Sequence, residues 1–186
     1  SSAIKGADCV ILLSAIVGRR FEDIKWSSPR NINLLASSVV LDAALEHGAH
    51  RLVFASSDVA YGGQTGVMYE TSLPRPVSLY ARLKLRLEER ILNHKHRDFH
   101  PTVLRIATCH GFAPRMRFDL VANQLILDAV CKKELYIDSG EQCRSLVSVD
   151  DAARSFLFCL RAHENLVSGE IFNVGAQEQT LQVNQL

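Results

Sequence analysis

A tyrosine and a lysine lie four residues apart in the segment Tyr80–Lys84. Residues four apart on a helix share a face, so both side chains can act on one ligand. A phenol has a pKa of about 10 and is a poor base at neutral pH, but a nearby ammonium stabilises the phenolate and lowers that pKa. The pair could therefore take a proton from a substrate hydroxyl while hydride leaves the adjacent carbon.

This spacing is common by chance, and it also fits an amphipathic helix with a partly buried Tyr80 and a solvated Lys84. The preceding segment favours chemistry, because Ser56 and Ser57 end an apolar run that predicts a strand. Ligands of a doubly wound sheet bind at the carboxyl ends of its strands. Ser57, 23 residues before Tyr80, could hydrogen-bond the reacting hydroxyl and orient it. A plain strand-to-loop turn is the alternative for the two serines.

The elements that would position these residues alternate along the chain. Apolar runs predict strands at residues 10–13, 51–55, 102–106, 135–137, 144–149 and 171–174. Periodic apolar positions predict helices at about residues 29–46, 78–93, 119–131 and 150–160. This alternation with short links predicts an α/β, Rossmann-like fold with a doubly wound parallel sheet. We expect Glu88 and Glu89 on the exposed side of the second helix.

The motifs divide the chain into a core and a smaller part. We expect residues 1–107 and 145–178 to form a Rossmann-like core that lacks the first βαβ units. Residues 108–144 are expected to form a substrate-binding part, and residues 179–186 to begin a C-terminal segment.

Taken in order, the motifs resemble the extended short-chain dehydrogenase/reductase superfamily, on its NAD-dependent nucleotide-sugar epimerase/dehydratase side. SSxxxYG and then YxxxK carry the resemblance. Five further segments match in order and cover nearly the whole chain. Residues 8–15 look like the family's strand beside the cofactor, and residues 31–33 look like the helix start whose first Asn supports the site. Residues 104–111 look like the motif LRxxNVYG. Residues 140–151 look like GxGxxRDFIHVDD, and residues 170–175 look like xxFNVG.

The resemblance implies an NAD-dependent enzyme, an isomerase or oxidoreductase that acts on a nucleotide sugar, for example by transient oxidation. It implies that Tyr80 is the acid/base, that Lys84 is its electrostatic partner and contacts the nicotinamide ribose, and that Ser57 orients the substrate. The implied cofactor-binding residues are Leu13, Ser14, Ala15, Asn31, Tyr80 and Lys84, and the implied substrate-binding residues are Asp58, Thr108, Arg117 and Arg144. NADP is not excluded as the cofactor.

Two departures from the family pattern matter. The GxxGxxG turn, which brings backbone N–H groups to the pyrophosphate, is absent from the sequence. We therefore interpret the chain as N-terminally truncated and expect it to bind NAD weakly or not at all. Val59 also stands where the dehydratase subgroup has Glu, which leaves the residues for water elimination incomplete.

Two other functions stay open. A non-catalytic fragment or pseudoenzyme would fit the missing glycine-rich turn. A short-chain reductase for a non-sugar carbonyl would keep Tyr80 and Lys84, although Arg144 argues against it because a guanidinium can bind a diphosphate in bidentate fashion. Arg144 could instead form a surface ion pair with Glu141 or Asp150.

The bulk composition excludes several classes. The chain has 186 residues, 47% of them hydrophobic, and a formal net charge of +1, which argues against a dedicated nucleic-acid binder. No apolar run approaches the roughly 18 residues of a membrane span, and no signal peptide is visible. The five cysteines form no CxxC pair, so we expect no metal site, reduced thiols and a cytoplasmic protein. A homodimer that pairs through two helices, one of them the YxxxK helix, is a further expectation from the resemblance.

Overall fold

The computed structural model describes residues 3–17, 30–64, 66–96, 98–137, 140–141, 143–176 and 180–185. The chain divides into two compact units, each described by itself below. One consists of Ser1–Arg105 and Phe156–Asn173, and the other of Ile106–Ser155 and Val174–Leu186. Within the described ranges, no helix is long and apolar enough to cross a membrane.

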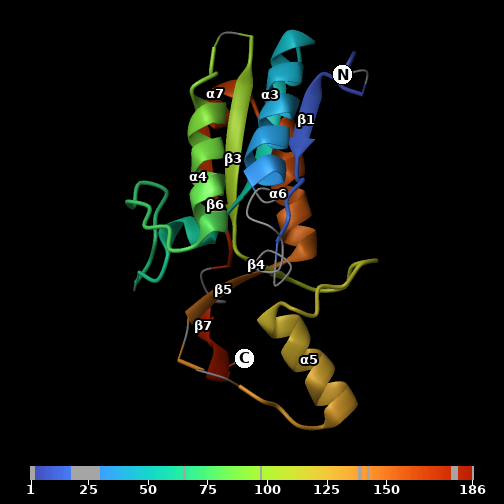
Figure 1. Cartoon of the computed structure of the whole chain (residues 1–186), viewed down its shortest axis with the longest axis vertical. Coiled ribbons are helices and arrows are strands. Elements are labelled where there is room, and N and C mark those ends of the chain that lie inside the picture. The colour runs from blue at the N-terminus through green and yellow to red at the C-terminus, as the bar shows by residue number, and fades with distance from the viewer. Residues whose placement is uncertain are drawn as a thin grey trace. The chain divides into compact units, whose positions relative to one another are not determined.

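The first unit is built on a four-stranded sheet. Its strands follow the order β1-β2-β3-β6, with bounds Cys9–Leu12, Arg51–Ser57, His100–Ile106 and Glu170–Val174 (Figure 1). β1 and β2 are parallel, with Cys9 opposite Arg51 and Leu12 opposite Phe54. The α/β Rossmann-like parallel sheet predicted from the sequence is confirmed, because buried apolar runs separated by helical segments can satisfy their backbone groups in this way.

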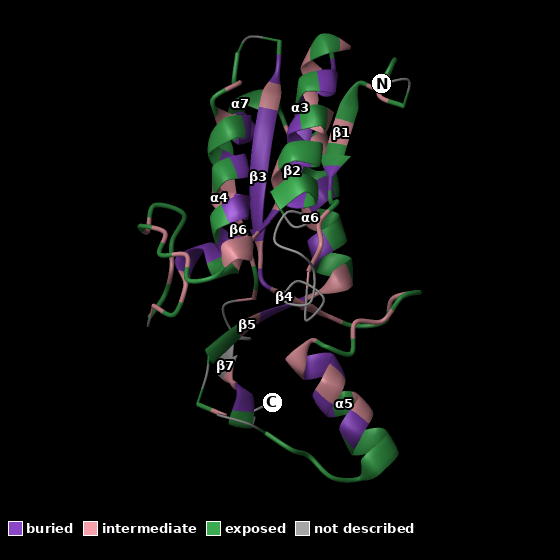
Figure 2. Cartoon of the chain, viewed as in Figure 1, coloured by how far each residue is buried: buried purple, intermediate pink, exposed green. Residues whose placement is uncertain are grey.

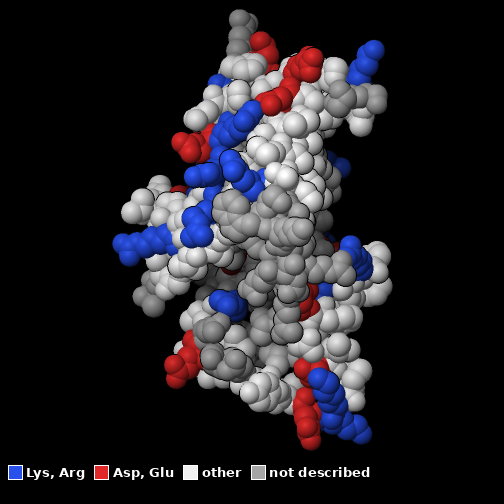
Figure 3. Space-filling model, in the orientation of Figure 1, with Lys and Arg blue, Asp and Glu red and all other residues white. Residues whose placement is uncertain are grey.

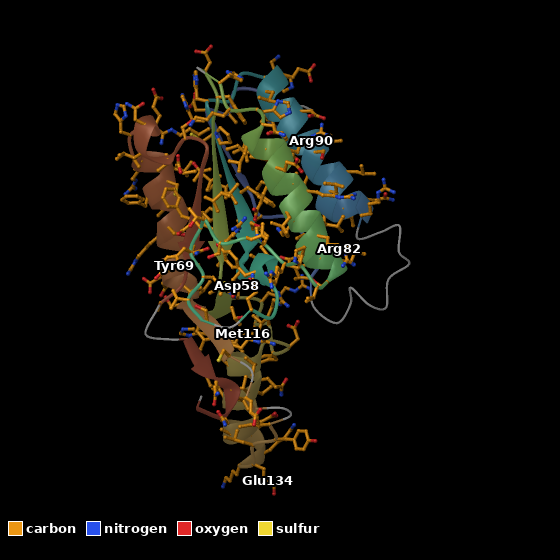
Figure 4. The ribbon with its side chains drawn as sticks, turned by 90° about the vertical axis from the view of Figure 1, so that its left-hand side faces the viewer. Asp58, Tyr69, Arg82, Arg90, Met116 and Glu134 are labelled. Atoms are coloured by element: carbon orange, nitrogen blue, oxygen red, sulfur yellow. The ribbon has the colours of Figure 1, made fainter. Side chains whose placement is uncertain are left out.

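Helices flank this sheet on both faces. The π-helical turn η1 (Asn31–Ala36) continues into α3 (Ser37–Glu46), and α4 (Leu79–Leu92) lies beside it (Figures 1 and 4). Residues 156–161, at the end of α6 (Val149–Arg161), lie on the other face. The helix α4 begins where the Ser78 hydroxyl accepts a hydrogen bond from the Ala81 N–H at 3.1 Å, an N-cap that satisfies a free backbone donor.

The core of the first unit lies between the sheet and its helices. Leu41 of α3, Leu87 of α4, and Phe54 and Val103 of the strands are fully buried in it (Figure 2). On the opposite face of the sheet, Arg51 of β2 binds the end of α6. Its Nη1 donates to the carbonyl oxygens of Cys159, Leu160 and Ala162 at 3.0, 2.9 and 2.7 Å. A cation at the carbonyl end of α6 also suits the helix dipole.

The second unit has a three-stranded sheet and one longer helix. The strands β4 (Thr108–His110), β5 (Cys143–Ser148) and β7 (Thr180–Gln182) follow the order β4-β5-β7, parallel and then antiparallel. The longer helix is α5 (Val121–Lys132), and η4 (Val183–Gln185) is a short helix of the same unit. The short helices of the first unit are η2 (Asp58–Tyr61) and α7 (Glu164–Val167).

Two sequence predictions are wrong in physical detail. Residues 135–137 form no strand and are exposed, because β4 and β7 already occupy both edges of β5. Glu88 does not lie on the exposed side of α4: it is 2% exposed, and its carboxylate pairs with Arg105 of β3 at 2.7 Å. Glu89 is exposed as predicted.

The Glu88–Arg105 pair generates a stability prediction. Removing one partner of a buried ion pair leaves an uncompensated charge and costs about 3–5 kcal/mol. We expect Arg105→Met to lower the free energy of unfolding by about that amount in chemical denaturation. The matched control is Arg90→Met, which breaks the exposed Arg90–Asp42 pair and should cost less than about 1 kcal/mol. Equal losses in the two variants would contradict this account.

Candidate functional site

The end of β2 turns directly into the short helix η2, and Ser57 lies at the junction. Its backbone is extended (φ −151°), and its hydroxyl accepts from the Val59 N–H at 3.5 Å as an N-cap. The same hydroxyl donates to Asp58 Oδ1 at 3.2 Å. Ser57 and Asp58 are half-buried. A hydroxyl at the carboxyl end of a central strand is thus present, as the sequence predicts, together with a neighbouring carboxylate.

Tyr80 and Lys84 share one face of α4. The Lys84 ammonium lies 5.7 Å from the centroid of the Tyr80 ring and 4.6 Å from that of Phe54, within the range of cation–π attraction. It donates to the carbonyl oxygen of Ala55 at 2.6 Å. Lys84 is only 3% exposed, so the alternative of a solvated lysine is wrong. Since Ala55 precedes Ser57 by two residues, the ammonium is fixed at the same strand end as the serine.

Burial perturbs this ammonium. Desolvation lowers the pKa of Lys84 from 10.5 to about 8, and the negative charge of Glu88 partly opposes that fall. Lys84 is therefore still charged at neutral pH, but only by a narrow margin. A cation in a dry environment acts strongly on a neighbouring phenol, because water screens it poorly there.

Asn33 fixes the segment that follows β1. Its side chain is buried, accepts from the Ile16 N–H at 2.7 Å and donates to the Ile16 carbonyl at 2.9 Å. Asn31, the residue predicted for this region, is exposed and does not make these bonds. The sequence has two asparagines here, Asn31 and Asn33, and either could have been the inward-facing one. The π-helical turn directs Asn33 inward, which the sequence pattern did not indicate.

The predicted cofactor segment after β1 lies open at its start. Leu13 and Ser14 are exposed, and Ala15 is half-buried. Asn33 fixes the backbone of Ile16. Leu13, with the small side chains of Ser14 and Ala15, therefore lies at the carboxyl end of β1.

Gly62 closes the η2 turn in a way that no other residue could. Its φ is +68°, and a Cβ placed there would lie 2.1 Å from the carbonyl oxygen of Arg75. The backbone is held by a bond from the Arg75 N–H to the Ala60 carbonyl at 3.0 Å. The final glycine of SSxxxYG therefore has a packing reason, a close backbone approach.

The remaining predicted residues lie in the second unit. Thr108 begins β4, opposite Leu146 of β5. Arg117 makes a two-point pair with Asp119, with Nε–Oδ1 at 3.1 Å and Nη2–Oδ2 at 2.6 Å. Arg144 is exposed on β5, and its Nη1 contacts the Cys143 carbonyl at 3.4 Å. Their assignment to substrate binding stays a prediction. In the part of the chain that is described, no cluster of three His, Cys, Asp or Glu residues could hold a metal ion.

Known proteins are similar to this chain in sequence and in fold. Residues 2–175 match the NAD dependent epimerase/dehydratase family. The uncharacterized UDP-glucose epimerase YtcB of Bacillus subtilis (strain 168) is 31% identical over 96% of this chain and 56% of its own length. The dTDP-D-glucose 4,6-dehydratase of Mus musculus is 27% identical over 77% of this chain and 40% of its own length. The chain thus spans about half the length of these curated relatives.

Solved structures agree with the fold. MoeE5 in complex with UDP-glucuronic acid and NAD has a TM-score of 0.86 and 30% identity, and covers 99% of this chain and 61% of its own. UDP-glucuronic acid 4-epimerase from Bacillus cereus, in complex with UDP-glucuronic acid and NAD, has a TM-score of 0.81 and 30% identity, with 95% and 56% covered.

The depressed pKa of Lys84 predicts a pH-dependent stability. Below pH 8 Lys84 is charged in both the folded and the unfolded chain, so the desolvation of the ammonium lowers the free energy of unfolding by its full amount. Between pH 8 and 10.5 only the folded state has lost the proton, so the free energy of unfolding should rise with pH, by about 2–4 kcal/mol relative to Lys84→Met.

Chemical denaturation at a series of pH values measures this difference between the wild type and Lys84→Met. Lys5→Met, which changes an exposed lysine, is the matched control. A difference curve that stays flat from pH 8 to 10.5 would show that the ammonium is not desolvated.

Proposed function

The chain belongs to the NAD-dependent epimerase/dehydratase family, and from this premise we propose that Ser57, Tyr80 and Lys84 form the site at which the whole protein epimerises a nucleotide sugar. The observation that carries the proposal is the buried Lys84 ammonium, 5.7 Å from the Tyr80 ring centroid and bonded to Ala55 beside Ser57. Such a juxtaposition costs stability, since it desolvates a charge. A functional demand on the phenol explains why that cost is tolerated.

The residues at this strand end fit the nicotinamide-ribose part of NAD. Lys84 and Tyr80 supply donors of the kind that ribose hydroxyls accept, and the small side chains of Ser14 and Ala15 leave the end of β1 uncrowded. Leu13 adds apolar surface there, and Asn33 holds the following turn. The chemistry that NAD would supply here is reversible hydride acceptance, and epimerisation requires that the hydride come back to the opposite face of the sugar carbon.

The chain's own residues would move the proton. The positive charge of Lys84 would stabilise the phenolate form of Tyr80, so that Tyr80 can remove the proton of a sugar hydroxyl as its carbon is oxidised. Ser57 would hold that hydroxyl in line by a hydrogen bond. The reverse transfer from Tyr80 would restore the hydroxyl once hydride has returned.

The substrate we propose is a uridine or thymidine diphosphate sugar, the class named for the relatives. Asp58 would contact the sugar. The substrate-binding roles of Thr108, Arg117 and Arg144, which belong to the second unit, stay predictions. Val59, next to Asp58, carries no transferable proton, which favours epimerisation over dehydration.

We also propose that two copies of the chain pair through η1 and α3. Ile32, Leu35 and Val39 expose apolar side chains there, with Val39 62% exposed, and the outward side of α3 is exposed in Figure 2. Basic side chains gather over the neighbouring α4 (Figure 3), where Arg82 and Arg90 point away from the sheet (Figure 4). An apolar row beside a charged rim is the usual anatomy of a protein interface.

The catalytic proposal predicts the effect of Tyr80→Phe. This change removes the phenolic oxygen and keeps the ring beside Lys84. In the whole protein, turnover of UDP-glucose should fall by about 10²–10⁴-fold, the range for a lost general acid–base group, while thermal stability and nucleotide-sugar affinity change little. Unchanged turnover with a verified substrate would show that the YxxxK spacing is coincidence.

The pairing proposal predicts the effect of Val39→Asp. A charge buried in an apolar interface is strongly unfavourable, so sedimentation velocity should show a shift from dimer to monomer. Val130→Asp, which changes an exposed valine on α5, is the control and should sediment like the wild type. If Val39→Asp remains dimeric, the interface lies elsewhere.

A further inference from the structure

A buried carboxylate lies one helical turn beyond Lys84 and has no part in the proton transfer proposed above. Glu88 accepts three hydrogen bonds from Arg105: Nε lies 3.2 Å from each carboxylate oxygen, and Nη2 lies 2.7 Å from Oε2. Ser56 donates a further bond to Oε1. Glu88 and Arg105 are 2% and 4% exposed, so water does not share in these contacts.

The contacts continue beyond the ion pair. Arg105 Nη1 donates to the Tyr61 hydroxyl at 2.9 Å, and that hydroxyl donates to Asn173 Oδ1 at 2.7 Å. The Asn173 amide donates to the Met68 carbonyl at 3.0 Å. One series of hydrogen bonds therefore joins α4, β2, β3, η2, β6 and the loop after Gly62.

Glu88 is attached to the site at two points. Along β2, Ala55 binds Lys84, Ser56 binds Glu88, and Ser57 is the residue assigned to the substrate. Along α4, Lys84 and Glu88 are four residues apart and share a face. The carboxylate thus acts on the serine through its neighbour in the strand, and on the lysine through its charge.

We propose that Glu88 is a positioning residue for the Ser57–Tyr80–Lys84 site: it holds the end of β2 against α4, and its single negative charge balances two buried cations. The inference rests on the function proposed above for Ser57 and Lys84. It assigns no contact between Glu88 and substrate.

The charges around Lys84 make the second role specific. The Tyr80 ring lies 5.7 Å from the Lys84 ammonium, Glu88 acts on Lys84 by its charge, and Arg105 of β3 pairs with Glu88. Arg105 binds both carboxylate oxygens of Glu88, so Glu88 acts on Lys84 through its charge, while Lys84 itself donates to Ala55 and lies near the rings of Phe54 and Tyr80. Without the negative charge, two buried cations would remain.

A purely structural role for Glu88 would have the opposite consequence for Lys84. Loosened packing would admit water and raise the pKa of Lys84 from about 8 toward its ordinary value, because desolvation is what lowers it. Loss of a balancing charge would lower that pKa further. The sign of the change therefore separates the two roles.

The experiment is a side-chain titration of Lys84 by heteronuclear NMR in the whole chain, with the resonance assigned from Lys84→Met. In Glu88→Gln, which keeps the shape but removes the charge and replaces one acceptor oxygen by an NH2 donor, the pKa of Lys84 should fall by about one unit or more. In Glu89→Gln, which removes the same charge from the exposed neighbouring position, it should not change. A pKa that is unchanged or raised in Glu88→Gln would overturn the proposal.

A second pair of variants decides the matter if Glu88→Gln does not fold. Ser56→Ala removes only the bond that ties β2 to the carboxylate, and amide hydrogen exchange at Ser57 and Val59 should become at least about tenfold faster. The control is Ser38→Ala, because the buried Ser38 hydroxyl has no hydrogen-bond partner in the described part of the chain. Equal exchange in the two alanine variants would overturn the proposal.

These readouts need neither cofactor nor substrate. If Tyr80→Phe keeps full turnover while Glu88→Gln lowers the pKa of Lys84, the assigned reaction is wrong and the coupling between Glu88 and Lys84 still holds. The two failures are therefore distinguishable.

Discussion

The carboxylate of Glu88 compensates positive charge that would otherwise be buried alone. Burial by itself lowers the pKa of Arg105, but hydrogen bonds to Glu88 and Tyr61 outweigh that effect and raise it. Loss of either partner would leave the other as an unpaired buried charge. The pair therefore fixes the position of helix α4 relative to strand β3. The ends of β2 and η2, where the candidate site lies, depend on that register through Ser56 and Tyr61.

The fold was largely predictable because its signals are local. Continuous apolar runs such as residues 51–55 indicate strands buried on both faces, and Ser78 marks the start of α4 as a cap residue should. The short strands β4 and β7 and the false strand at residues 135–137 were not predictable, because edge pairing depends on which partner is near in space. Apolar content alone does not show that β5 already has two neighbours.

The site divides in the same way. Tyr80, Lys84 and Ser57 could be found because fixed spacings along one helix and one strand place them, whereas Asn33 and Glu88 act through bonds to residues 17 and 32 positions away. Glu88 misled the sequence interpretation because an acidic residue in a basic helix is usually solvated. Its partners, Ser56 and Arg105, lie on two other elements, so the helix pattern contains no trace of them. The roles assigned to Thr108, Arg117 and Arg144 stay predictions.

The tight approach of Gly62 to the Arg75 carbonyl also limits how the gene can vary. Every single-codon replacement at position 62 adds at least a Cβ, and the nearest atom to it would be backbone at 2.1 Å, which cannot swing aside as a side chain can. To relieve the clash of such a Cβ with the Arg75 carbonyl, the loop between residues 62 and 75 would have to change in length, because a second substitution would not move that backbone. Position 62 should therefore be among the least tolerant in a saturation library, although glycine has no side chain that could take part in the reaction.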